Sequence, residues 1–320
     1  MFLLTVIALL LVFLISFFLL VLHLWEKQHG TFTGPDFGKT SVKYNGVDYV
    51  LKDNVETFLI IGLDKFEEDT AADSYNNDQQ ADFLLLVVFD NVSEKFTAIH
   101  INRDTMANVN ILGVAGNKID TVVKQIALAH TYGNGRDVSC RNTADSVSDL
   151  LLGVKVDHYI SLTMDSVAIL NDLVGGVEVT VLDDFTGIDD TLVQGETVTL
   201  SGEHALKYIR ARYGLEDSSN IRRMERQRQY IDSLYKKAQE CIENDDEFIV
   251  EASLKMSDHI VSDRSVTQLQ TLANKFNEYE FDEIRTIDGE SKTGEQFMEF
   301  YPDEDSIKKM VIDLFYKPET

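Results

Sequence analysis

Six of the eleven arginines in the chain fall between positions 210 and 228. Arg210 and Arg212 are separated by one residue, so both side chains leave the same face if this stretch is extended. Planar guanidinium groups suit phosphate oxygens, which they can grip in a bidentate manner. In a chain of formal net charge −25, this concentration of cations predicts a site for a polyanion, most simply a phosphate or pyrophosphate. The alternative is that these arginines pair with Asp and Glu on a solvated surface.

Three side chains at the start of the longest predicted helix favour the same chemistry. Arg223, Arg226 and Gln227 are three and four residues apart, so they share a helix face. The N-terminus of a helix also presents free backbone N–H groups and the positive end of the helix dipole. We therefore expect this face to contribute to the polyanion site.

A pair of acidic residues lies at the ends of two predicted strands. Asp64 follows the apolar residues IIGL, and Asp82 opens the apolar run FLLLVVF. Carboxylates at the ends of adjacent strands can meet across the mouth of a loop. Hard oxygen ligands with open positions suit Mg²⁺, or Mn²⁺ in its place, bridging to a phosphate. The alternative is that each aspartate caps a turn or faces water.

The sequence INRDT places Arg103 and Asp104 just past a predicted strand end, where the active sites of α/β proteins gather. Alone, this dipeptide is equally well explained by a surface ion pair.

Several other functions are excluded or unsupported. The chain has no GxSxG, Walker A, HExxH or GxGxxG motif, and its seven histidines show no ligand spacing. An acidic chain is poorly suited to binding nucleic acid through its overall field, so no nucleic-acid partner is expected. The only two cysteines, Cys140 and Cys241, can form one disulfide or none.

The first segment predicts a membrane anchor. Residues 2–24 contain no Asp, Glu, Lys or Arg, and as a helix they would span about 34 Å, enough for a bilayer core. A cleaved signal peptide is the alternative, but the run is long, no basic region precedes it and no A-x-A site follows. We expect a single-pass protein of the cell membrane whose remaining residues are extracellular.

The positioning elements alternate between strands and helices. The pattern predicts a hairpin over 41–51 turning at Asn45-Gly46, because both turn positions favour positive φ. Apolar runs predict further strands at 57–62, 83–89 and 95–101, with 83–89 central in the sheet. The remaining expected elements are helices over 121–130, 142–152, 164–173, 201–206 and 221–241, strands over 177–182 and 283–287, and acidic helices elsewhere in 242–320.

These elements indicate an α/β fold: a single three-layer-like domain with a central mixed sheet flanked by helices, behind one N-terminal transmembrane helix. The expected divisions are a transmembrane signal-anchor (1–25), a stalk and β-hairpin (26–56), a catalytic domain (57–240) and an acidic C-terminal extension packed on the same domain (241–320).

The order of the motifs resembles the LytR–CpsA–Psr family of bacterial envelope proteins over about residues 57–234. Such proteins are phosphotransferases that move a glycopolymer from a polyprenyl-pyrophosphate carrier onto peptidoglycan. The resemblance rests on IIGLD (60–64), QADFLLLVV (80–88), INRDTM (101–106), NKID (117–120), HTYGNG (130–135), LLGVKVDHYISL (151–162), LNDLVGGVEVTV (170–181), LSGEHALKYIRAR (200–212) and RRMERQRQYI (222–231).

The resemblance assigns roles to the residues that match these motifs. It implies that the acids bind the metal, that the Arg-Asp motif and the R-x-R pair act in catalysis, and that the arginines and the helix glutamine bind pyrophosphate. The metal residues are Asp64 and Asp82, the catalytic ones Arg103, Asp104, Arg210 and Arg212, and the pyrophosphate-binding ones Arg103, Arg210, Arg212, Arg223, Arg226 and Gln227.

Three positions depart from the family pattern. Gln80 stands where an Arg is usual, Asn220 where an Asp is often found, and Asp120 where an Asn is usual. The three departures weaken the expected grip on pyrophosphate. Those at Gln80 and Asn220 give weight to a non-catalytic scaffold that binds polyprenyl phosphate or cell wall. A transcriptional regulator or attenuator is a further alternative, against which extracellular placement and acidic charge argue.

The resemblance also implies a mechanism. A sugar hydroxyl attacks phosphorus while Mg²⁺ and the arginines neutralise the developing charge, and Asp104 is one possible base for the hydroxyl proton. The helices expected between 121 and 173 would wall an apolar groove for the polyprenyl tail.

Overall fold

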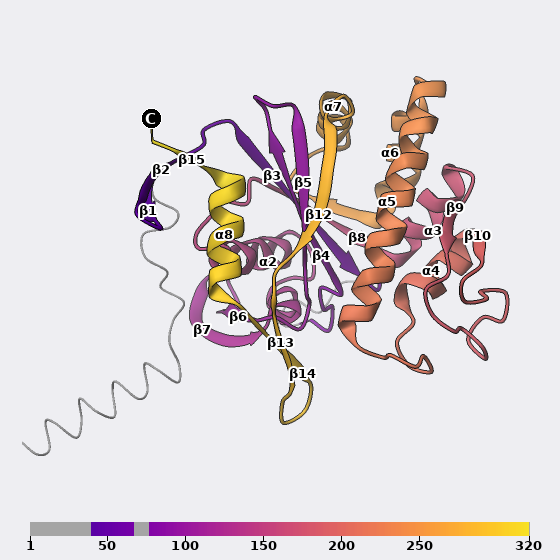
Figure 1. The fold of residues 1–320 in the computed structure, drawn as a ribbon, viewed down its shortest axis with the longest axis horizontal. Helices are drawn as coiled ribbons and strands as arrows, with labels where there is room; N and C mark the ends of the chain where they lie inside the picture. The colour runs from indigo at the N-terminus through magenta and orange to yellow at the C-terminus, as the bar shows by residue number, and fades with distance from the viewer. Residues whose placement is uncertain (1–39, 67–76, 320) are drawn as a thin grey trace, which may run out of the picture. The chain divides into compact units, whose positions relative to one another are not determined.

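A computed structural model of the chain describes residues 40–66 and 77–319 (Figure 1). Within these residues, no helix is both long and apolar enough to cross a membrane. The predicted anchor over 2–24 and most of the predicted stalk lie outside the described residues, as does the middle of the loop that follows Asp64.

A six-stranded mixed sheet forms the centre of the fold, in the order β11-β8-β3-β4-β5-β12. β3 is parallel to β8 and antiparallel to β4, while β5 is antiparallel to β4 and parallel to β12. The prediction of a central strand over 83–89 is confirmed. The strands are β3 (Val55–Leu63), β4 (Phe83–Asp90), β5 (Lys95–Ile101), β8 (His158–Thr163), β11 (Ile260–Ser262) and β12 (Glu280–Thr286).

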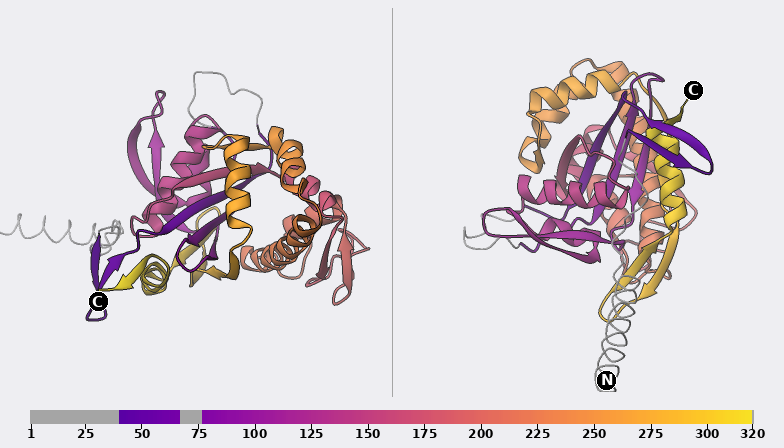
Figure 2. Two further views of the ribbon diagram at one scale, coloured as in Figure 1. Left: turned by 90° about the horizontal axis from the view of Figure 1, so that it is seen from above. Right: turned by 90° about the vertical axis from the view of Figure 1, so that its left-hand side faces the viewer.

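Helices cover both faces of this sheet, which confirms the flanked mixed sheet. On one face, Leu85 of β4 and Ala98 of β5 pack against Ile231 of α5. α2 contacts β8, and Figure 2 shows α2 and α5 on opposite sides of the sheet. The helices of the described residues are α2 (Asp137–Leu150), α3 (Met164–Leu173), α4 (Gly202–Arg210), α5 (Asn220–Asn244), α6 (Phe248–Met256), α7 (Val266–Phe276) and α8 (Glu304–Phe315).

A second apolar cluster fixes the helices that carry the arginines. The short antiparallel pair β9 (Val177–Thr180) and β10 (Thr197–Leu200) packs with α3, α4 and α5 around the buried rings of Phe185 and Tyr208. These rings are stacked with their centroids 5.6 Å apart. The cluster therefore holds the end of α4 close to the first turns of α5.

A substitution at Gly176 would test how tightly this cluster is packed. Its φ is +94°, and a Cβ there would lie 2.7 Å from Thr199 Cγ2 and 3.0 Å from the Leu200 carbonyl oxygen. Gly187 has a similar φ of +82° but open space around it. We expect Gly176→Ala to lower the free energy of unfolding by about 2–4 kcal/mol and Gly187→Ala by about 1 kcal/mol, because only the first adds a clash to the backbone strain. Equal losses in chemical denaturation would contradict the packing argument.

The helix predicted over 121–130 is wrong. Residues Lys118–Gln125 form β7, which pairs with β6 (Met106–Leu112), and only Ile126–Thr131 form a 3-10 helix, η1. The β-branched run Thr121-Val122-Val123 favours an extended chain. Residues 121–125 therefore belong to a strand and do not form a helical wall of the predicted groove.

Residues 241–320 contribute more strands than the one predicted. β11 and β12 occupy the two edges of the central sheet. β13 (Gly289–Thr293) and β14 (Met298–Pro302) form a hairpin beside β6 and β7, and β15 (Tyr316–Pro318) pairs with β2. The predicted N-terminal hairpin is confirmed as β1 (Ser41–Tyr44) and β2 (Val47–Leu51), with positive φ at both turn residues.

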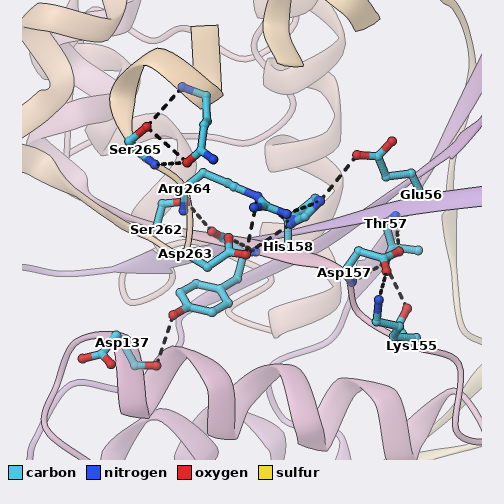
Figure 3. A network of polar contacts seen from close by, with 12 residues as sticks. Glu56, Thr57, Asp137, Lys155, Asp157, His158, Ser262, Asp263, Arg264 and Ser265 are labelled. Carbon is cyan, nitrogen blue, oxygen red and sulfur yellow. Dashed lines mark hydrogen bonds and ion pairs between the residues drawn. The ribbon is translucent and has the colours of Figure 1, made fainter. Parts of the chain in front are cut away.

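A polar network ties this C-terminal segment to the sheet at the end of β3 remote from Asp64 (Figure 3). His158 at the start of β8 lies 3.1 Å from Asp263 and 3.4 Å from Glu56. The guanidinium of Arg264 contacts both nitrogens of the same imidazole. The edge strand β11 is thus held by side chains as well as by backbone pairing.

Candidate active site

The two predicted metal-binding acids lie at one end of neighbouring strands. Asp64 follows β3 and Asp82 precedes β4, and the Asp82 N–H donates to the Gly62 carbonyl at 2.9 Å. Both aspartates line a cavity of about 330 Å³. Antiparallel pairing of β3 and β4 brings them together, because the end of one strand adjoins the start of the next. The cavity is lined by Asp64, Lys65, Asp78, Gln79, Gln80 and Asp82.

Arg103, in the turn after β5, contacts two of the residues that line this cavity. Its guanidinium is paired with the carboxylate of Asp82 and donates a hydrogen bond to the side-chain oxygen of Gln80. Its Nε is buried, lies 3.6 Å from Asp104 Oδ1 and has no hydrogen-bond partner. Gln80, at a position where the family pattern usually has Arg, here accepts from Arg103.

Asn102 and Asn220 join the Arg103 turn to the first residue of α5. The Asn102 side-chain oxygen accepts from the Asp104 N–H at 2.9 Å and from the Asn220 amide at 2.6 Å. Both asparagines are buried. An aspartate at position 220 would have no amide hydrogen to donate, so this link depends on the departure from the family pattern.

The R-x-R pair lies at the end of α4 rather than in an extended stretch. Arg210 is the last residue of the helix, so the argument that both side chains leave one face of an extended stretch does not apply. Its guanidinium donates to Asp64 at 2.8 Å in an exposed pair. Arg212 donates from Nε to the Ser218 carbonyl at 3.2 Å. Because an exposed ion pair contributes only about 0–1 kcal/mol, an anionic ligand can compete for Arg210.

Arg223 approaches the same place from the first turn of α5. It is only 7% exposed, and one terminal nitrogen donates to the Asp82 carbonyl at 3.4 Å. Its buried Nε has no hydrogen-bond partner. Ser219 caps this helix by accepting from the Arg222 N–H, so the position of Arg223 is fixed by a normal helix start.

Arg226 and Gln227 are directed differently from Arg223. Arg226 is completely buried, donates to the Tyr208 carbonyl at 2.9 Å and also contacts the Ala211 carbonyl and the Asp183 carboxylate. Gln227 donates to the Ile209 carbonyl at 3.2 Å. Both side chains bind the backbone on either side of Arg210, so in this geometry they hold the end of α4.

Burial and mutual repulsion shift the ionisation of the clustered groups. Burial, helped by the nearby Arg103 and Arg212, lowers the pKa of Arg223 to about 9. Burial also lowers the pKa of Arg103, although Asp104 opposes that shift. Burial raises the pKa of Asp104 against the pull of the surrounding arginines. The cluster is short of negative charge, and a bound anion would stabilise its protonated arginines.

The family model described as the LytR_cpsA_psr family matches residues 30–314. The chain belongs to this family. The resemblance read from the motifs is thereby confirmed, and the match extends through most of the C-terminal segment.

Curated relatives of this LytR_cpsA_psr protein include cell-wall transferases. It is 27% identical over 237 residues to the polyisoprenyl-teichoic acid–peptidoglycan teichoic acid transferase TagU of Bacillus licheniformis, covering 73% of this chain and 69% of that protein. It is 26% identical over 240 residues to Biofilm regulatory protein A of Streptococcus mutans, covering 71% of this chain but only 56% of that protein.

Solved structures share the fold of this family member. A structure of TagT bound to LI-WTA superposes with a TM-score of 0.62 at 18% identity, covering 87% of this chain and 94% of that one. Protein gbs0355 from Streptococcus agalactiae superposes with a TM-score of 0.65 at 20% identity, covering 82% and 86%. At these identities the likeness establishes the mixed α/β architecture.

The donor set at Asp64 and Asp82 fits a divalent cation shared with a phosphate. Mg²⁺ is usually bound through one or two carboxylates together with substrate oxygens and water, rather than by a full protein cage. Two aspartates that line one cavity match that pattern. No group of three or more His, Cys, Asp or Glu suited to a metal occurs among residues 40–66 and 77–319.

Sequence reasoning missed several residues that shape this site. Gln125 donates to Asp104 Oδ1 at 3.1 Å, and Asp183 holds Arg226. Asn102 organises the Arg103 turn. Gln125 was not identified because its stretch was predicted as a helix. Asp183 follows the predicted strand 177–182 directly, and that position was a weak indication of its role. The two cysteines are not bonded to each other.

Proposed function

We propose that this protein transfers an anionic glycopolymer from a polyprenyl-pyrophosphate carrier to peptidoglycan. Membership of the LytR_cpsA_psr family and similarity to TagU support a glycopolymer transferase. The chain covers 69% of TagU of Bacillus licheniformis, 66% of TagU of Enterococcus faecalis and 56% of Biofilm regulatory protein A. The proposal therefore rests on the site of this chain as well as on its relatives.

The observation that carries the proposal is a pair of buried guanidinium groups with unused donors. The Nε atoms of Arg103 and Arg223 have no hydrogen-bond partner, although buried polar groups are nearly always paired. Both arginines contact Asp82, which lines the cavity. A diphosphate supplies acceptors for several such donors at once. An anion of this kind is the ligand that the arrangement suits best.

The proposed reaction is displacement at phosphorus. The hydroxyl oxygen of the acceptor bonds to the phosphorus that carries the glycan, while the bond from that phosphorus to the bridging oxygen breaks and polyprenyl monophosphate leaves. The hydroxyl proton passes to a carboxylate, for which Asp104 is the candidate. Arg103, Arg210 and Arg223 neutralise charge that develops on the phosphoryl oxygens and the leaving group.

In this proposal, Asp64 and Asp82 would hold Mg²⁺ or Mn²⁺. The cation adds positive charge at the reacting phosphoryl oxygens when it is bound. Before the donor arrives, the two aspartates are paired with Arg210 and Arg103. Donor binding would then be an exchange, in which the phosphates pair with the two arginines and the two carboxylates become free to hold the cation.

The proposed location is the outer face of the cell membrane. Residues 2–24 form the single-pass anchor in this proposal, and the catalytic domain is extracellular. Tethering the site to the membrane raises its effective concentration near a donor that is itself held in the lipid.

Transfer by the full-length protein in detergent tests this function. The donor is a labelled polyprenyl-pyrophosphate oligosaccharide, the acceptor is purified peptidoglycan, and label on the polymer is measured. We expect Asp82→Asn to reduce transfer by about 100-fold or more, because it removes a carboxylate that would hold the cation. EDTA should have the same effect on the wild type until Mg²⁺ is restored, because it removes the cation itself. Either change takes stabilising positive charge away from the phosphates.

Asp149→Asn is the matched control, because Asp149 is an exposed aspartate on α2 that accepts from Asn108. It should transfer at the wild-type rate. Tight donor binding without transfer or release of polyprenyl phosphate by the wild type would contradict the transferase and leave the non-catalytic scaffold.

A further inference from the structure

The carboxylate of Asp104 is held from a side that the family motifs do not mark. It is 6% exposed, and its Oδ1 lies 3.6 Å from Arg103 Nε. The same oxygen accepts a hydrogen bond at 3.1 Å from the amide of Gln125, the last residue of β7. A single carboxylate oxygen of Asp104 therefore lies next to the cationic Arg103 and to the neutral amide of Gln125.

Gln125 is itself fixed by the C-terminal part of the chain. Its amide nitrogen also donates to the Met298 carbonyl of β14 at 2.7 Å. The Asp104 carboxylate and the Met298 carbonyl can only accept hydrogen bonds. The Gln125 side chain must therefore face them with its amide nitrogen, which carries two hydrogens. One of these hydrogens is donated to the Asp104 carboxylate and the other to the Met298 carbonyl of β14.

The same hairpin holds the backbone of Asp104. The Phe300 N–H donates to the Asp104 carbonyl at 2.9 Å, and Phe300 also forms a parallel bridge with Thr105. Phe300 is buried, so this contact is part of the packed structure. The β13–β14 hairpin therefore fixes the main chain of Asp104 directly and its side chain through Gln125.

The geometry matters because Asp104 is surrounded by arginines. Arg103, Arg212 and Arg223 all lie near enough to act on its charge. The carboxylate already lies within ion-pair distance of Arg103, so a further donor is needed to fix the direction in which it faces. Proton transfer requires it within hydrogen-bond reach of the acceptor hydroxyl. A neutral amide donor can hold the carboxylate in place without neutralising it.

We propose that Gln125, anchored by the β14 backbone, is a positioning residue that orients the Asp104 carboxylate to take the proton of the acceptor hydroxyl. This role rests on the proposed transferase function and gives residues 289–302 of the C-terminal segment a part in the reaction. Gln125 itself touches no reacting atom in this proposal.

The test compares Gln125→Met, Asp104→Asn and the double variant in the full-length protein. Methionine keeps the length of the side chain and removes both donors. We expect kcat for transfer to fall about tenfold in Gln125→Met and about 100-fold in Asp104→Asn, with KM for the donor within about twofold of wild type, because only orientation of the base is lost. The double variant should be no slower than Asp104→Asn, since both changes act through one carboxylate.

Gln194→Met is the matched control, because Gln194 is an exposed glutamine whose amide donates to the Leu182 carbonyl at 3.0 Å. Should Gln125→Met not fold, Gln125→Glu serves instead and is expected to lose at least as much kcat.

The results separate the two proposals. Wild-type kcat in the Gln125 variant, a loss confined to KM for the donor, or additive losses in the double variant would overturn the role of Gln125 while the transferase stands. A wild-type protein that transfers nothing would overturn the transferase and, with it, this role.

Discussion

Arg223→Met is expected to weaken binding of a polyprenyl-pyrophosphate donor by about 30–150-fold, the equivalent of about 2–3 kcal/mol for a charge-assisted hydrogen bond. The physical reason is that Arg223 is buried with an unused Nε donor beside Asp82. Binding of a short-chain polyprenyl pyrophosphate by the full-length protein, measured by titration calorimetry in detergent, gives the affinity.

The same substitution should leave the protein as stable as the wild type or more so. Burial and the neighbouring Arg103 and Arg212 lower the pKa of Arg223, which means that its charged form is poorly accommodated without a ligand. Removing it takes away that cost. Loss of affinity together with retained or higher unfolding temperature is a pattern that a general packing defect cannot produce.

Arg141→Met is the control for loss of an arginine. Arg141 lies exposed on α2, paired with Asp137 one turn earlier, and it contacts nothing in the cavity. Its removal should leave donor affinity at the wild-type value. Wild-type affinity in Arg223→Met would show that the diphosphate does not use the buried guanidinium groups.

The strands that the sequence predicted, such as β4 and the N-terminal hairpin, each carried a local signal. FLLLVVF is apolar throughout, as expected for a strand covered on both faces, and it lies in the middle of the sheet. Asn45-Gly46 specified its hairpin by backbone preference alone. These elements needed no knowledge of their neighbours.

β6, β7 and the C-terminal strands carried weaker signals. β7 alternates charged and β-branched residues over its exposed length, and its pairing with β6 is the interaction that makes it a strand. β11 pairs with β8, which is far away in sequence, so nothing in the local sequence around β11 indicates its partner. Tertiary pairing decided the structure of these segments.

The candidate site was predictable to the level of residue type. Arg103, Arg210 and Arg223 each contact Asp64 or Asp82, whereas Arg212 and Arg226 contact other parts of the chain. The direction of each side chain was not predictable. Arg223 and Arg226 were expected to share one helix face and one ligand, yet Arg226 is enclosed by the protein, because Asp183 and two carbonyls lie within its reach.

This difference makes Arg226 a structural support for Arg210. Its donors contact the carbonyls of Tyr208 and Ala211, and its guanidinium lies over the Phe185 ring at 5.7 Å. An arginine buried in this way needs a counter-charge, which Asp183 provides to both Arg226 and Arg222. The geometry of the R-x-R pair therefore depends on an aspartate that does not line the cavity.

Asp183→Ala is expected to lower the free energy of unfolding by about 3–5 kcal/mol, because it leaves Arg226 charged, fully buried and without its counter-ion. The unfolding temperature should fall by roughly 10 °C, which differential scanning fluorimetry measures. Asp184→Ala, at the exposed neighbouring aspartate, should leave the transition near the wild-type temperature. Asp183→Leu combined with Arg226→Met removes both charges and should recover much of the lost stability. The double variant should bind the donor more weakly than the wild type, because Arg226 no longer donates to the Tyr208 and Ala211 carbonyls on either side of Arg210. A double variant that regains stability and binds donor like the wild type would show that Arg226 does not position the R-x-R pair.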